Sequence, residues 1–254
     1  MADTHRRTRA LARLAGAGAL TAALGGCTTF DSTLGMGDLV AAAPSTGVDP
    51  FVTSAVSATP VERLAPSGGY NYALIYGSST VDGKPIPAVD YERVGYEHLR
   101  RKVAWGGPER PGDIVIDTGG RYLYLVQPGG SAIRYGIAVG REGFGWTGRE
   151  KLSWKREWPT WTPPESMIER EPDLARWRDG MPGGADNPLG ARALYLGNTL
   201  YRIHGTNKPY SIGKAASSGC FRMINQDVLD LYQRVQPGAT VHVRSSVPPE
   251  VAFN

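Results

Sequence analysis

Short apolar runs separated by turn residues dominate the chain from about residue 110 onward. Ile114–Thr118 and Arg121–Val126 flank the pair Gly119-Gly120, and Ala132–Val139 follows a further Pro-Gly-Gly turn. β-Branched and aromatic runs around such turns are typical of β-hairpins. We therefore expect three strands here that line one half of a sheet-based core.

Further strand patterns lie closer to the C-terminus. Leu194–Leu196 and Thr199–Ile203 flank Gly197-Asn198, which favours a two-residue hairpin turn. Thr240–Val243 predicts a last strand.

The clearest helix pattern covers Gln226–Val235. Leu229, Tyr232 and Val235 recur every three residues, and Asn225 precedes them as a plausible N-cap. A Pro-Gly pair follows and ends the pattern. Together these segments predict a mainly β, sandwich-like domain with one helix near its end.

The stretch between Gly140 and Gly190 is a long insertion rich in tryptophan. Long loops in compact domains are commonly lids or binding loops. The alternative is that the aromatic side chains fill a satellite core. The tryptophans concerned are Trp146, Trp154, Trp158, Trp161 and Trp177.

The first part of the chain is less regular. Residues 28–68 are rich in Ala, Ser, Thr, Pro and Gly, as expected of a flexible tether. Ordered structure is expected to begin near Tyr70, with Tyr72–Tyr76 as a short strand. Asp90–Val103 is expected to be irregular or partly helical.

Composition narrows the class of protein. The 254 residues are 41% hydrophobic and 20% charged, which suits one ordinary globular domain with tails. Of the formal net charge of +4, the first 26 residues hold +3, from four arginines and one aspartate. The remaining 24 basic and 23 acidic side chains are nearly balanced, so the sequence does not indicate a nucleic-acid-binding face.

Residues 1–26 have the pattern of a signal peptide. Four arginines precede Leu14–Leu24, an uncharged stretch too short to span a bilayer. Leu24-Gly-Gly-Cys27 resembles a bacterial lipobox, which implies cleavage before Cys27, lipidation of Cys27 and stable membrane anchoring. A plain secretory signal is the alternative, and Arg6-Arg7 is only a weak twin-arginine pattern. Thr28 after the lipobox points by analogy to the outer membrane.

The second cysteine, Cys220, carries candidate chemistry. His204 ends a strand pattern sixteen residues earlier, and an imidazole is the usual base for a nucleophilic thiol. A structural role for both residues is the alternative. Two cysteines are enough for one disulfide, but a disulfide between Cys27 and Cys220 is not expected. Cys27 belongs to a processing signal, and Cys220 lies in a segment with the pattern of a catalytic loop.

The surroundings of Cys220 favour catalysis. Ser217-Ser218-Gly219-Cys220 is expected to run into a helix start, where backbone amides form an oxyanion hole and the helix dipole favours a thiolate. Arg222 offers a guanidinium for a substrate carboxylate.

These residues closely resemble the active-site signature of the L,D-transpeptidase (YkuD-like) family, of the Gram-negative periplasmic type. The signature is carried by His204-Gly-Thr-Asn207, Ser217–Met223 and Asn225. The resemblance covers about residues 110–245 and includes the Ile114–Val126 hairpin and Asn187-Pro-Leu-Gly190. Many members have His where this chain has Ser218, so His204 is left as the base.

The resemblance implies a two-step acyl transfer on peptidoglycan. The Cys220 thiolate attacks the L-centre carbonyl of diaminopimelate in a tetrapeptide stem, and D-Ala leaves with a proton from His204. An amine, either of another stem or of an outer-membrane protein lysine, then takes the acyl group. A backbone carbonyl near Gly205 or Thr206 is implied to orient His204.

Other residues complete the expected site. Tyr201, Ser217, Ser218, Gly219 and Asn225 are expected to line it beside Arg222. No cofactor is expected. His98 and His242 lack further ligands at metal-binding spacing, so no catalytic metal is expected either.

Three alternatives stay open at this stage. A hydrolase of the same fold, such as an L,D-carboxypeptidase, would use water as acceptor. A cell-wall cysteine peptidase or amidase most often has Cys before His, the reverse of the order here. A non-catalytic wall-binding lipoprotein would keep only the fold.

The expected domain organisation has five parts. They are a signal peptide at 1–26, a tether at 27–68, a pre-domain segment at 69–111, the catalytic domain at 112–245 and a tail at 246–254.

Overall fold

The computed structural model describes residues 69–140, 146–216, 220–248 and 251–253, all within the second of two compact units, residues 56–254. The expected signal peptide, the lipobox and the whole of the expected tether lie outside these residues, as do Ser217, Ser218 and Gly219. Within the described ranges, no helix is both long and apolar enough to cross a membrane.

Strands predominate in the described residues, in agreement with the expected mainly β fold. They are β1 (Ser79–Val81), β2 (Lys84–Ile86), β3 (Arg101–Trp105), β4 (Ile114–Asp117), β5 (Tyr122–Gln127), β6 (Ser131–Gly136), β7 (Ala138–Gly140), β8 (Gly148–Glu157), β9 (Arg192–Leu196), β10 (Arg202–His204), β11 (Ala215–Ala216), β12 (Phe221–Arg222), β13 (Thr240–Arg244) and β14 (Ala252–Phe253). The α-helices are α1 (Tyr72–Ile75), α2 (Tyr91–Val94), α4 (Glu165–Arg170) and α5 (Asn225–Arg234). Short 3₁₀ turns are η1 (Tyr96–His98), η2 (Pro172–Trp177) and η3 (Pro209–Ser211).

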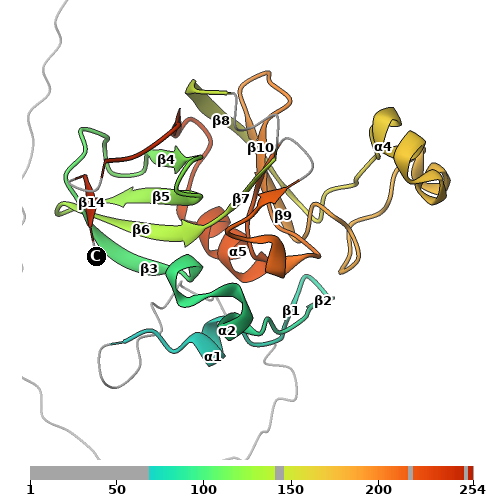
Figure 1. Ribbon diagram of the computed structural model, residues 1–254, viewed down its shortest axis with the longest axis horizontal. Coiled ribbons are helices and arrows are strands. Elements are labelled where there is room, and N and C mark those ends of the chain that lie inside the picture. The colour runs from blue at the N-terminus through green and yellow to red at the C-terminus, as the bar shows by residue number, and fades with distance from the viewer. Residues whose placement is uncertain (1–68, 141–145, 217–219, 249–250, 254) are drawn as a thin grey trace, which may run out of the picture. The chain divides into compact units, whose positions relative to one another are not determined.

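Most strands belong to one mixed sheet with the order β11-β7-β12-β10-β9-β8-β13-β4-β5-β6-β3-β14. The sheet folds over at β8, whose first residues pair with β13 and whose last residues pair with β9. Two facing halves result, and α5 lies between them at one end (Figure 1). This arrangement is sandwich-like, as the strand pattern predicts.

One apolar core fills the space between the halves. Ile116 and Leu125 come from one half, Ile203 and Phe221 from the other, and Leu231 from α5, all of them fully buried. Strand alternation sends every second side chain to this core and the others to the outer face. This alternation therefore determines to which face of the sheet each side chain of β10 and β12 points.

The expected strands of this sheet are present, with three differences. The run Ala132–Val139 is divided at Ile137 into β6 and β7, which pair with different neighbours. The turn between β9 and β10 covers five residues rather than two, and Leu196 N–H bonds to the Tyr201 carbonyl at its base. Sequence analysis missed β8 in the tryptophan-rich insertion, because charged residues interrupt its apolar alternation.

The strand expected at Tyr72–Tyr76 is wrong, since α1 occupies these residues. The Asn71 side chain accepts a hydrogen bond from Leu74 N–H at 3.1 Å and caps this single turn. β3, another strand that was not expected, starts within the segment Asp90–Val103.

The segment that contains α1 and α2 is bound to α5 by buried polar contacts. The Tyr76 hydroxyl donates to Asp227, and Arg100 Nη1 lies 2.8 Å from Asp230 Oδ1. Gln226 donates to three backbone carbonyls of the same segment. Residues 70–100 therefore brace the helix that follows the site.

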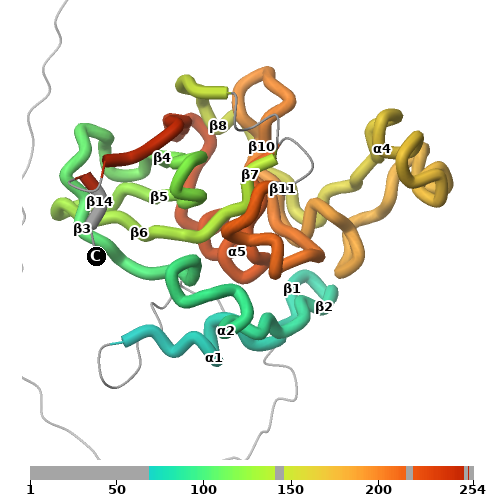
Figure 2. The backbone as a smooth tube through the Cα atoms, viewed as in Figure 1, coloured from blue at the N-terminus to red at the C-terminus, as the bar shows by residue number. Residues whose placement is uncertain are grey.

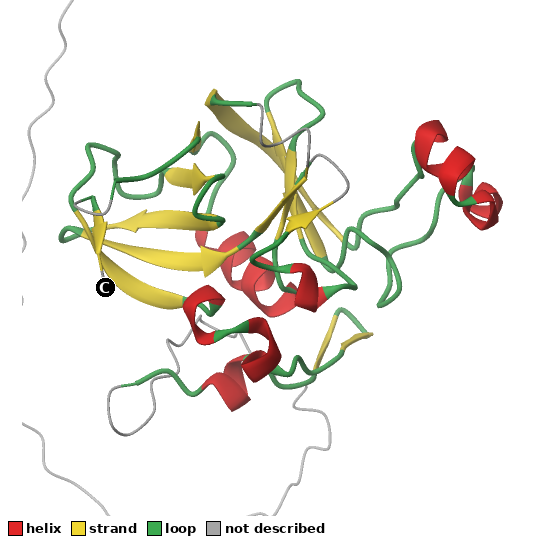
Figure 3. Cartoon of the chain, in the orientation of Figure 1, coloured by secondary structure: helices red, strands yellow, loops and turns green. Residues whose placement is uncertain are grey.

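The rest of the insertion, between β8 and β9, forms an arm that carries α4 and η2 away from the sheet (Figure 2; helices in red in Figure 3). Its base is fastened by Asn187, which is fully buried and donates to the carbonyls of Pro159, Met181 and Pro182. Trp161 and Met181 form a β-bridge across the arm. The tryptophans serve different purposes: Trp154 lies on β8, whereas Trp161 and Trp177 belong to the arm.

Candidate active site

Cys220 and His204 lie on neighbouring strands of the sheet. β12 runs parallel to β10, with Phe221 beside Ile203 and Arg222 beside His204. The side chains of Ile203 and Phe221 enter the core, so those of His204 and Arg222 point to the outer face. Cys220 directly precedes Phe221 and, by alternation, belongs to the same outer face. With strands about 4.8 Å apart and about 3.3 Å per residue, the Cys220 and His204 Cα atoms are about 8 Å apart.

The expectation that Cys220 runs directly into a helix start is wrong. β12 and two further residues separate Cys220 from α5, whose first residue is Asn225. Cys220 instead enters a strand, with its Sγ 3.8 Å from the Leu200 carbonyl and its own carbonyl bonded to Gly140 N–H. The dipole of α5 therefore does not act on this thiol, since such effects fade within one turn.

The His204 ring has a defined orientation. Its Nδ1 lies 2.6 Å from the Gly205 carbonyl oxygen, so Nδ1 carries the proton and Nε2 keeps a lone pair. Burial lowers the pKa of His204 to about 3, with the positive charges of Arg222 and Arg202 acting in the same direction. The ring is therefore a neutral imidazole at neutral pH. Gly205 supplies the kind of carbonyl that the family resemblance implies.

Arg222 is half-buried beside this pair. Its Nη1 donates to Ser211 Oγ at 3.0 Å. Burial lowers the pKa of Arg222, and the charge of Cys220 opposes this shift. A thiolate at Cys220 and the Arg222 guanidinium therefore attract one another.

Asn225 is buried and bonded to backbone groups on both sides of the site. Its Oδ1 accepts from Ala191 N–H at 3.0 Å and from Thr206 N–H at 3.2 Å, and its Nδ2 donates to the Thr206 carbonyl at 2.9 Å. The expected N-cap role is wrong: Ile224 has the N-cap position, and Asn225 begins the helix. A β-carbon at Gly205 would collide with Asn225 Oδ1.

Tyr201 and Arg202 divide between the two faces of the sheet. The Tyr201 ring stacks on Trp146, with centroids 4.4 Å apart, and both pack at the edge of the core. Arg202, two residues before His204, shares the outer face with it. Sequence analysis missed Arg202, although alternation back from His204 would have indicated it.

The remaining expected residues divide into two groups. Ser217, Ser218 and Gly219 lie outside the described residues. The segment Asn187-Pro-Leu-Gly190 packs behind β10, where a β-carbon at Gly190 would meet the backbone of Gly205 and Thr206.

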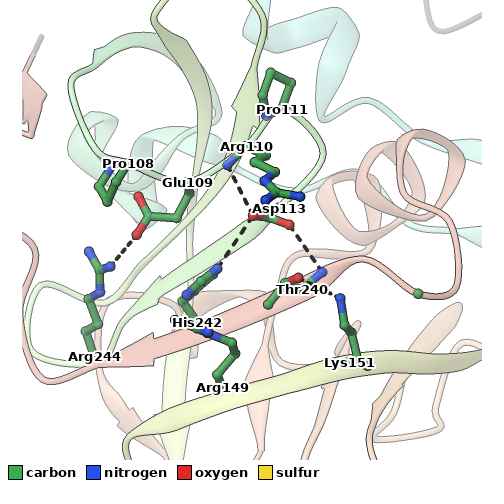
Figure 4. Close-up of a pocket in the computed structure, with 11 residues that line it drawn as sticks. Pro108, Glu109, Arg110, Pro111, Asp113, Arg149, Lys151, Thr240, His242 and Arg244 are labelled. Atoms are coloured by element: carbon green, nitrogen blue, oxygen red, sulfur yellow. Dashed lines mark hydrogen bonds and ion pairs between the residues drawn. The ribbon is translucent and has the colours of Figure 1, made fainter.

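A separate cleft of about 610 Å³ lies away from this site (Figure 4). It opens between β13, the start of β8 and residues 108–113. Arg244 pairs with Glu109, and His242 Nε2 lies 3.6 Å from Asp113 Oδ2. Neither Cys220 nor His204 lines this cleft.

Sequence comparison finds related proteins for the part of the chain that holds this site. A family model, described as the YkuD L,D-transpeptidase catalytic domain, matches residues 111–243. The Escherichia coli K12 protein named "Probable L,D-transpeptidase YbiS" is 38% identical over 138 residues, which are 50% of this chain and 43% of that protein. The chain thus spans less than half the length of this curated relative.

Solved structures with similarity cover about half of the chain. A crystal structure from Brucella melitensis, described as a probable carnitine operon oxidoreductase, is 52% identical. The match covers 54% of this chain and 88% of that one, with a TM-score of 0.40. The catalytic domain of an L,D-transpeptidase from E. faecium is 19% identical, with 54% and 100% covered and a TM-score of 0.40.

Proposed function

Because the chain belongs to the YkuD family of L,D-transpeptidase catalytic domains, we propose that it catalyses L,D-transpeptidation of peptidoglycan, with Cys220 as nucleophile and His204 as base. The observation that carries this proposal is the register of β10 and β12. It directs the side chains of Cys220, His204 and Arg222 to one face of the sheet.

In the first step, the Cys220 sulfur attacks the L-centre carbonyl of diaminopimelate in a tetrapeptide stem. Nε2 of the neutral His204 takes the thiol proton, because Nδ1–H is bonded to Gly205. Since a base with so low a pKa holds a proton weakly, proton transfer accompanies attack. The nearby Arg222 cation stabilises the thiolate that develops.

The amide bond then breaks. The D-Ala amine leaves with the proton from His204, and an acyl thioester remains on Cys220. An acceptor amine attacks this thioester and gives a proton to His204. His204 passes that proton to the Cys220 sulfur, which leaves the acyl group as the thiol. Backbone amides at Ser217, Ser218 and Gly219 are proposed to hold the tetrahedral oxyanion, and Tyr201 with Trp146 to flank the entrance.

Asn225 is proposed to act as a positioning residue. Its three hydrogen bonds bind the ends of β9 and β10 to α5. This keeps the Gly205 carbonyl, and with it the His204 ring, in place.

The enzyme is proposed to work in the periplasm. Lipidation of Cys27 would anchor it to the outer membrane, with residues 27–68 as the tether to a catalytic domain at 112–245. Palmitate labelling that disappears in Cys27→Ser would support the anchor, and labelling that persists would remove it.

The test of activity uses the fragment from about residue 60 and a disaccharide tetrapeptide, followed by mass spectrometry. Loss of D-Ala with formation of a dimer is expected. Loss of D-Ala alone would indicate a carboxypeptidase. Full activity in Cys220→Ala would contradict the mechanism, whereas complete inactivity of the wild type would favour a non-catalytic wall-binding protein.

An independent test addresses the thiol itself. Carbapenems acylate the cysteine of this family, so meropenem is expected to add its mass to the wild type but not to Cys220→Ala. An unchanged wild-type mass would count against an accessible nucleophile.

A further inference from the structure

Four neighbouring strands place one residue each in a row across the outer face of the sheet. Trp154 of β8 pairs with Tyr195 of β9, and Tyr195 pairs with Arg202 of β10. Phe221 lies beside Ile203 in the next pair of strands, so the same register one residue earlier sets Cys220 beside Arg202. The candidate nucleophile is therefore at one end of the row.

The aromatic members of the row support Arg202. The Trp154 and Tyr195 rings stack with centroids 3.5 Å apart and planes 6° apart. The Arg202 guanidinium carbon is 5.5 Å from the Tyr195 ring centroid, within the range of a cation–π contact. The stack thus limits the freedom of the Arg202 side chain on the face that carries His204.

Arg202 has no acidic partner among the residues that the structure describes. Its Nε is buried and makes no hydrogen bond to them. Two other arginines of the sheet do have acidic partners: Arg192 lies 2.7 Å from Asp82, and Arg244 pairs with Glu109. A half-buried guanidinium without a carboxylate, one strand away from a nucleophile, has the properties of an anion-binding group.

We propose that Arg202 binds a carboxylate of the stem peptide that donates the acyl group and so determines which donors Cys220 accepts. This inference rests on the proposed function and deepens it. A stem peptide that ends in D-Ala and contains diaminopimelate has several carboxylates near the carbonyl attacked. Arg222 lies on β12 directly beside His204, and its Nη1 is already bonded to Ser211. The two guanidiniums therefore face different parts of a donor.

The position of Arg202 agrees with this role. Adjacent strands are about 4.8 Å apart, so Arg202 and Cys220 begin at neighbouring points of the sheet. The Arg202 side chain extends toward Tyr195, away from Cys220. A carboxylate bound by Arg202 would therefore lie close to the scissile amide without belonging to the amide itself.

The experiment compares wild type with Arg202→Gln on disaccharide-tetrapeptide donors. In one donor all carboxylates are free, and in the others one carboxylate at a time is a carboxamide. For one of these amides, kcat/KM of the wild type is expected to fall about tenfold or more, as for loss of a charge-assisted hydrogen bond. On the donor with free carboxylates, kcat/KM of Arg202→Gln should be lower than that of the wild type by the same factor. Replacing that carboxylate with a carboxamide should not lower kcat/KM of the variant any further. Arg202→Lys should recover part of the preference.

Arg156→Gln is the matched control, because Arg156 lies over the Trp154 ring at the far end of the row. It should keep the wild-type donor preference. Iodoacetamide should alkylate Cys220 at equal rates in wild type and Arg202→Gln, because the Arg202 side chain extends toward Tyr195 and away from the thiol.

Three results would overturn the inference. One is an unchanged donor preference in Arg202→Gln, and another is an equal loss on every donor. Slower alkylation in Arg202→Gln would mean that Arg202 acts on the thiol instead. Failure of the proposed function is recognised separately, because the wild type would then convert none of the donors.

Discussion

Nδ1 of His204 lies 2.6 Å from the carbonyl oxygen of Gly205, the next residue in the chain. This contact between neighbours defines the tautomer of the ring without a carboxylate partner. The third member of many catalytic triads is an acid that raises the basicity of the imidazole. A carbonyl orients the ring but adds no charge, so burial controls the pKa of His204.

The first prediction concerns stability and pH. The folded-state pKa of His204, about 3, lies below its ordinary value of 6.5. The unfolded chain therefore binds a proton between these values that the folded chain does not. This contribution to stability is present above pH 6.5 and is lost as pH falls toward 3. By linkage, His204 should lower the free energy of unfolding by about 3 kcal/mol between pH 7.5 and 4.5.

Urea denaturation of wild type and His204→Gln at both pH values measures this. The wild type should lose more stability on acidification than the variant, and the difference isolates His204 from other titrating groups. Equal losses in the two proteins would mean that His204 titrates normally.

The second prediction concerns catalysis by His204. Replacement with Ala removes the proton acceptor and donor, so kcat/KM for D-Ala release should fall about 10²- to 10⁴-fold. His242→Ala is the control, because His242 lies in the separate cleft and should have near wild-type activity. A loss of less than tenfold in His204→Ala would exclude it as the base.

The third prediction concerns Asn225. Asn225→Ala leaves the buried backbone groups of Ala191 and Thr206 without their partners, which should cost about 2–4 kcal/mol of unfolding free energy. Activity should also fall at temperatures where the variant is folded. Asn207→Ala is the matched control: Asn207 makes one exposed bond to the Asp186 carbonyl, so its loss should cost under about 1 kcal/mol. Similar costs for the two variants would argue against a bracing role for Asn225.

The fourth prediction concerns the contact between residues 70–100 and α5. Burial raises the pKa of Asp227 to about 7, and Arg100 opposes this shift. Arg100→Met should destabilise the fold by about 3–5 kcal/mol, because the buried Asp227 loses its cation and Asp230 keeps only Arg234.

The cost of Arg100→Met should be larger at pH 8 than at pH 5.5. A carboxyl with a raised folded-state pKa loses stability as pH rises through that value. Thermal denaturation at both pH values measures the effect. Arg93→Met is the control, since the exposed Arg93 lies over the Tyr210 ring and its loss should cost under about 1 kcal/mol. A pH-independent loss in Arg100→Met would contradict the assigned charge state of Asp227.

Sequence patterns predicted the strands whose alternation is regular, such as β4, β5 and β13. They failed where a strand carries charged residues on both faces, as in β8. One of these residues, Lys155, donates hydrogen bonds to the carbonyls of Tyr232 and Val235 at the end of α5. They also failed at α1, where one capped turn overrides the β propensity of its tyrosines.

The sequence by itself determined the mainly β class, the signature residues Cys220 and His204, and the family. The fold class follows from local periodicity, and the family from the resemblance of the signature residues to a known motif; both are properties of the chain alone. Only the tertiary structure decided that Cys220 enters a strand, that Asn225 braces β9 and β10, and that the register of β10 and β12 sets Arg202 beside Cys220. The physical reason is that strand pairing joins residues far apart in sequence, and the register between two strands is not encoded in either one.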